Sequence, residues 1–66
     1  MKLTLGLEEV NERFYPILIE ELSNYQPIVI QKDNNYVTVK AEGDIIKCAS
    51  IIAICDKYRF TGGHHE

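Results

Sequence analysis

The chain has 66 residues, of which 45% are hydrophobic and 26% charged, and its formal net charge is −3 at pH 7. A chain of this length forms one domain with a small core, and the ordinary composition argues against general disorder. The acidic balance lacks the basic surface that phosphate backbones require, so nucleic-acid binding is not expected. We predict one domain over residues 1–60 and a flexible tail over residues 61–66.

The first residues, Met1 to Gly6, include neither a long apolar stretch nor a small-residue cleavage site, as a secretory signal would. The most apolar segment, residues 44–60, is interrupted by Lys47 and is shorter than the roughly 20 residues that cross a bilayer. Two cysteines in such a chain are most simply free thiols in a reducing compartment. We therefore expect a cytoplasmic protein without a membrane partner.

Alternating polar and leucine side chains over residues 2–5 indicate a short strand or an extended lead-in that stops at Gly6. From residue 7 to residue 25 the apolar period becomes helical, and Pro27 closes the predicted helix. The apolar side of this helix is expected to contain Leu7, Val10, Phe14, Ile17, Leu18, Leu22 and Tyr25.

The opposite side of the same predicted helix is acidic and comprises Glu8, Glu9, Glu12 and Glu20. Such a face is usually only solvated, but it could also bind a basic partner surface. Pro16 falls inside the helix and is expected to kink it. The kink would turn Glu21 outward, which favours a structural role for this carboxylate over a buried catalytic one.

A β-hairpin is predicted next, with strands at residues 28–30 and 36–41 and a turn within residues 33–35. A loop at residues 33–34 would pair Ile30 with Val37, whereas a loop at residues 34–35 would pair it with Val39. We prefer the first pairing. Both direct Thr38, Lys40 and Glu42 away from the core.

Residues 44–60 predict a buried C-terminal helix that begins after Gly43 with Asp44 as its N-cap. A strand over residues 50–55 is the alternative, but the length, the caps and the polar positions 47, 50 and 57 favour a helix. Its core face is expected to contain Ile45, Cys48, Ala49, Ile52 and Cys55.

The predicted fold class is therefore α+β, with the order α-β-β-α, or β-α-β-β-α if residues 2–5 pair, and the hairpin packed on the C-terminal helix. If Pro16 divided the first helix in two, the order β-α-α-β-β-α would resemble that of one type of KH domain. This resemblance is one of element order alone. The Gly-x-x-Gly backbone clamp of those domains is absent, and the helix where it would lie is acidic.

The residues that most often carry chemistry form no recognisable catalytic or metal-binding motif here. Cys48 and Cys55 would lie about 10.5 Å apart along a helix, too far to form a disulfide or to bind one zinc ion together, and are expected to be buried core residues. Adjacent His64 and His65 on a flexible tail provide neither the number nor the geometry of ligands for a metal site. We expect no catalytic residues, no metal site and no cofactor.

One surface of the C-terminal helix does suggest a function. Ile51, Ile54 and Tyr58 form an apolar row opposite the expected core face. Either the first helix or residues 1–5 cover this row, or it binds a second chain, and we favour the second. The sequence thus predicts a small non-catalytic interaction module that binds another protein and is most simply a homodimer. A nucleic-acid-binding domain is the alternative.

Overall fold

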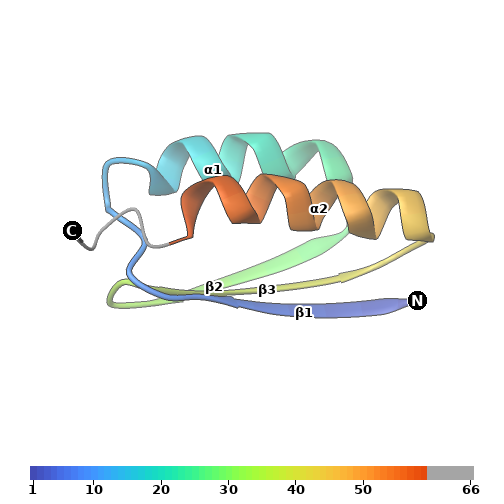
Figure 1. Ribbon diagram of the computed structural model, residues 1–66, viewed down its shortest axis with the longest axis horizontal. Coiled ribbons are helices and arrows are strands. Elements are labelled where there is room, and N and C mark those ends of the chain that lie inside the picture. Colours follow the sequence, from blue (N-terminus) through green and yellow to red (C-terminus); the bar gives the residue numbers. More distant parts are fainter. Residues whose placement is uncertain (60–66) are drawn as a thin grey trace.

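Two helices cover one face of a three-stranded antiparallel sheet in the computed structural model, which describes residues 1–59 (Figure 1). The elements, in chain order, are β1 (Lys2–Leu7), α1 (Tyr15–Leu22), a 3-10 turn η1 (Ser23–Tyr25), β2 (Ile28–Asp33), β3 (Tyr36–Glu42) and α2 (Ile45–Tyr58). The predicted α+β class is confirmed, and of the two predicted orders the structure has β-α-β-β-α, because residues 2–7 pair with β3. A single α-helix precedes β2, so the two-helix order that resembled KH domains is not observed.

The sheet has the order β1-β3-β2, which makes β1 and β2 its outer strands. Ile30 pairs with Val39, and Asp33 pairs with Tyr36, so the turn consists of Asn34 and Asn35. The preferred pairing of Ile30 with Val37 is wrong, and the alternative register is right. Asn34 has a φ of 57°, a left-handed conformation that asparagine tolerates better than most residues, and this favours the loop one position later.

The first helix is shorter than predicted, because residues 8–14 form a loop and α1 begins only at Tyr15. Pro16 therefore lies in the first turn, where its missing N–H would have no helical partner, and it starts the helix instead of kinking it. Leu7 and Val10 are fully buried, as predicted, although neither is helical. The Val10 N–H donates to the carbonyl of Asn35 at 2.9 Å and fixes the loop against the hairpin turn.

α2 begins where the sequence predicted, because the Asp44 side chain accepts a hydrogen bond of 2.8 Å from the Lys47 N–H. Its core face is different from the prediction. Of the five expected core residues, Cys48 and Cys55 are buried, whereas Ile45, Ala49 and Ile52 are exposed.

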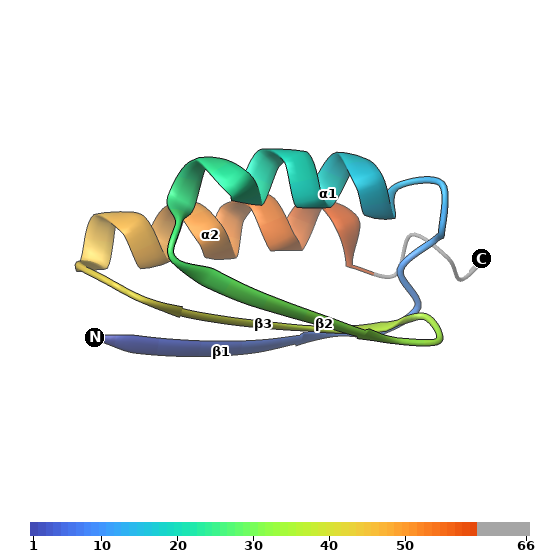
Figure 2. The same cartoon turned by 180° about the vertical axis from the view of Figure 1, so that it is seen from behind.

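α2 lies on the β1 side of the sheet and faces the viewer in Figure 1, whereas α1 lies on the β2 side and faces the viewer in Figure 2. The core between these two layers consists of Leu7, Val10, Leu18, Leu22, Val37, Val39, Ala41, Ile51, Cys55 and Tyr58. The other face of the sheet is not covered by any described element (Figures 1 and 2). Within residues 1–59, no helix is long and apolar enough to cross a membrane.

Candidate functional site

The apolar row predicted as a partner interface lies inside the protein. Ile51 is 0% exposed and Tyr58 is 9% exposed, while Ile54 is partly buried against the same core. The prediction that this row is exposed is therefore wrong. The chain itself covers these residues, because α2 packs against both α1 and β1, as the alternative reading of the row expected.

The predicted acidic helix face does not exist as such. Glu8, Glu9 and Glu12 lie in the loop between β1 and α1, and only Glu20 belongs to a helix. All four side chains are exposed. Because α1 starts eight residues later than the periodicity suggested, these carboxylates lie on two different segments and do not share a helix face.

The exposed apolar surface of α2 includes three residues that the sequence placed in the core. Ile45 is 69% exposed, Ile46 is 74% exposed and Ile52 is 38% exposed. Ala49 and Ala53 are exposed on the same side of the helix, as their spacing of about 100° per residue requires. We name these five residues the apolar flank of α2. An exposed contiguous apolar surface on a small protein commonly marks an interaction site.

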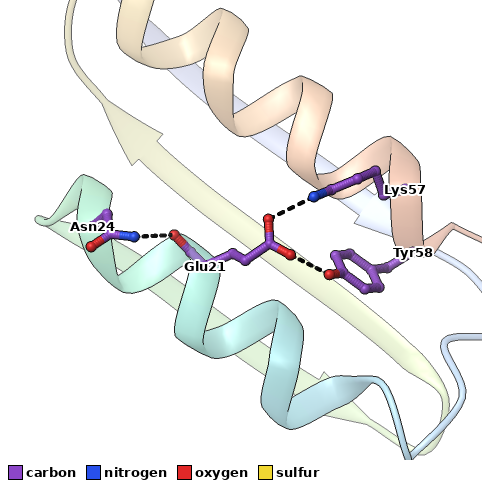
Figure 3. A network of polar contacts seen from close by, with 4 residues as sticks. All are labelled: Glu21, Asn24, Lys57 and Tyr58. Atoms are coloured by element: carbon purple, nitrogen blue, oxygen red, sulfur yellow. Dashed lines mark hydrogen bonds and ion pairs between the residues drawn. The ribbon is translucent and has the colours of Figure 1, made fainter.

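A network of polar contacts joins α1 to the last turn of α2 (Figure 3). The Glu21 carboxylate accepts a hydrogen bond from Lys57 Nζ at 2.7 Å and another from the Tyr58 hydroxyl. Asn24 donates to the backbone carbonyl of Glu21 at 3.3 Å. The network ties the last turn of α2 to the last turn of α1, so its evident effect is to fix the two helices relative to each other.

The pKa values of the three side chains shift together. Hydrogen bonds from Lys57 and then from Tyr58 lower the pKa of Glu21 below its ordinary value of 4.5. The hydrogen bond to Glu21 raises the pKa of Lys57 above 10.5 and the pKa of Tyr58 above 10.0. Each group is therefore held in its ordinary charge state at neutral pH, which suits a structural contact and not proton transfer.

A shallow groove of about 400 Å³ lies at the end of the sheet where β1 and β2 begin. Its walls are mostly apolar, and its polar side chains include Lys2, Thr4, Lys40 and Glu42. No ion pair joins the charged groups among these within the described part of the chain. The groove lacks the convergent polar groups that fix a specific ligand.

The two cysteines are buried free thiols, as predicted. Burial raises the pKa of the Cys55 thiol to about 11, so the reactive thiolate is disfavoured at neutral pH. No group of three potential metal-ligating side chains forms among residues 1–59. His64 and His65 lie outside the described residues.

The apolar flank of α2 is the feature that differs most from an ordinary protein surface. Comparisons with protein families, with curated proteins and with solved structures find no match for this chain. The candidate site therefore rests on geometry alone. Sequence reasoning named three residues of this flank, Ile45, Ala49 and Ile52, but assigned them to the core, because α2 is apolar on nearly every side.

Proposed function

We propose that this protein is a small, non-catalytic interaction module that self-associates through the apolar flank of α2. The observation that carries the proposal is the exposure of three isoleucines on one helix, 69% for Ile45, 74% for Ile46 and 38% for Ile52. Leaving this much aliphatic surface in water is unfavourable, because fully burying a completely exposed isoleucine contributes about 1.5–3 kcal/mol and each of these side chains would gain the corresponding fraction. The partner is a second copy of this chain.

A second copy is supported by the pattern of large and small side chains on the flank. Ala49 lies near its centre, with Ile45 one turn before it and Ala53 one turn after it. If two α2 helices pack antiparallel about a two-fold axis at Ala49, Ile45 of each lies opposite Ala53 of the other. Small residues opposite large ones allow close approach, and the antiparallel arrangement also opposes the helix dipoles favourably.

Two matched substitutions test the proposal. Ile45→Glu introduces a charge into the flank, and Ile17→Glu introduces the same charge at an isoleucine of α1 that is 45% exposed. Both sites lie in the first turn of their helix, where a carboxylate is compatible with the helix dipole. Light scattering after size exclusion should show a dimer for the parent and for Ile17→Glu, and a monomer for Ile45→Glu.

The parent measurement decides the proposal first. A parent that stays monomeric at millimolar concentration contradicts self-association. A dimer that survives Ile45→Glu contradicts the flank as its contact surface. Circular dichroism of each variant establishes that the helices remain folded.

A further inference from the structure

The outer edge of β1 carries backbone groups that point away from the sheet. Met1 and Gly43 exchange two hydrogen bonds, of 2.7 Å and 3.0 Å. In an antiparallel ladder such pairs alternate with pairs that form no bonds to each other. Leu3, Leu5 and Leu7 therefore bond to β3, whereas Lys2, Thr4 and Gly6 direct their N–H and C=O groups outward.

One of these outward groups already has a partner. Arg59 Nη1 donates to the carbonyl of Gly6 at 3.5 Å and covers the far end of the edge. The backbone groups of Lys2 and Thr4 have no partner among the described residues. Lys2 and Thr4 therefore each offer an N–H and a C=O at the sheet edge, and these groups can pair with a further strand.

The helix that carries the apolar flank, α2, lies over this same side of the sheet (Figure 1). α2 packs on β1, and its first residue follows the Gly43 that is bonded to Met1. Four residues of a helix and two residues of a strand both span about 6–7 Å along their axes. Ala49, four residues after the start of α2, therefore lies at about the level of Leu3, two residues after Met1. The centre of the flank and the centre of the free edge therefore lie at about the same level along the molecule.

We infer that β1 pairs antiparallel with β1 of a second copy, about a two-fold axis at Leu3. Lys2 of each chain then exchanges backbone hydrogen bonds with Thr4 of the other, and the two sheets form one continuous six-stranded sheet. This inference rests on the proposed self-association and specifies its geometry. The same axis passes beside Ala49, so strand pairing and packing of the two α2 flanks occur in one interface.

The register avoids unfavourable contacts and uses a side chain that is otherwise exposed. Lys2 lies opposite Thr4 of the second copy, so no like charges face each other directly. By the alternation of the strand, Met1 lies on the helix-covered face with Leu3 and Leu5 and is placed opposite Leu5 of the second copy. Met1 is 65% exposed in the single chain, and this pairing would bury it.

The edge of β2 is less suited to the same role. The Ile28 N–H is already bonded to Gln26 Oε1 at 3.1 Å. At the other end of β2, Lys32 lies with its Nζ 5.6 Å from the centre of the Tyr15 ring. By the alternation of β2, this lysine lies on the helix-covered face with Val37, unlike Lys2 on the uncovered face, and an inward-pointing charge disfavours the approach of another strand.

The test removes one outward N–H from each edge. Thr4→Pro deletes a group that the inferred interface uses, without breaking a bond to β3, since the Thr4 N–H faces away from the sheet. Lys32→Pro is the matched control, because the Lys32 N–H points outward from β2 by the same alternation. Sedimentation equilibrium should show at least a tenfold higher dimer dissociation constant for Thr4→Pro and less than a twofold change for Lys32→Pro.

Hydrogen exchange of the parent protein gives a second measurement that requires no variant. As the dimer forms with rising concentration, the amides of Lys2 and Thr4 should become protected, while those of Ile30 and Lys32 on the β2 edge should not. A dimer with unprotected Lys2 and Thr4 amides overturns the strand pairing. If that dimer is still lost in Ile45→Glu, the proposed function stands. A monomeric parent overturns both.

Discussion

At the scale of single residues, Glu21 shows how a side chain that breaks a pattern can be structural. On a helical wheel it lies on the apolar side of its helix, and the sequence predicted that a kink would turn it outward. Without a kink it remains half-buried and faces α2, where Lys57 neutralises its carboxylate and both Lys57 and Tyr58 donate hydrogen bonds to it. A carboxylate can occupy this position because both of its oxygens have donors.

This contact predicts a dependence of stability on pH. Because the folded-state pKa of Glu21 is lowered, its stabilising contribution is complete above the ordinary pKa of 4.5 and is lost as the pH falls through the folded value. The raised pKa values of Lys57 and Tyr58 have the opposite consequence, since stability is lost as the pH rises above about 10.

Glu21→Gln should therefore lower the thermal midpoint at neutral pH and flatten its decline between about pH 5 and pH 3. The exposed neighbour Glu20 provides the matched control, and Glu20→Gln should leave that acid-induced decline unchanged. Thermal melts followed by circular dichroism across this range make the comparison. Parallel acid-induced declines for the parent and Glu21→Gln would contradict the assigned role.

At the scale of elements, the sequence predicted what local signals encode. The turn-forming residues 33–35 indicated the hairpin, Asp44 marked the start of α2, and leucine alternation over residues 2–5 indicated a strand. These features depend on a few adjacent residues, which is why they could be inferred without the fold.

The errors arose where apolar residues allow more than one arrangement. Leu7 and Val10 continue the apolar period of α1 toward the N-terminus, yet the helix starts only at Tyr15, with Pro16 in its first turn. On α2, isoleucines occur on nearly every side, so periodicity does not select a core face. The contact of Tyr58 with Glu21 and the packing of Ile51 fix its rotation, and both depend on partners distant in the sequence.

The rotation of α2 can be tested by comparing two isoleucine-to-alanine substitutions. Ile51→Ala removes fully buried methyl groups and should cost about 2–5 kcal/mol of unfolding free energy. Ile45→Ala changes a side chain that is 69% exposed and should alter it by about 0.5 kcal/mol or less. Urea unfolding at low protein concentration, where the chain is monomeric, measures both. Equal costs would mean that the core face is assigned incorrectly.

At the scale of the whole molecule, a domain of 66 residues buries a modest fraction of its surface and is only marginally stable alone. Association of folded chains adds stability by mass action. The proposed dimer would enlarge one hydrophobic layer and extend the sheet at the same time. Folding and assembly would then be linked.

The thermal midpoint of the parent should therefore rise with protein concentration. For two-state unfolding of a dimer of this size, each tenfold increase should raise the midpoint by about 5 °C. Differential scanning calorimetry over two decades of concentration measures the slope, and Ile45→Glu should show none. A parent midpoint independent of concentration would contradict the link between assembly and folding.

The difference between the two edges of the sheet has a consequence for how far growth can proceed. A protein whose two sheet edges could both pair with a further strand would add copies without limit and form fibres. Here Gln26 accepts the outward N–H of Ile28, and Lys32 places a charge on the helix-covered side at the other end of the β2 edge, whereas β1 has only apolar side chains on that side. In the proposed dimer the two β1 edges are joined and only the less receptive β2 edges face outward, so we expect growth to stop at two chains.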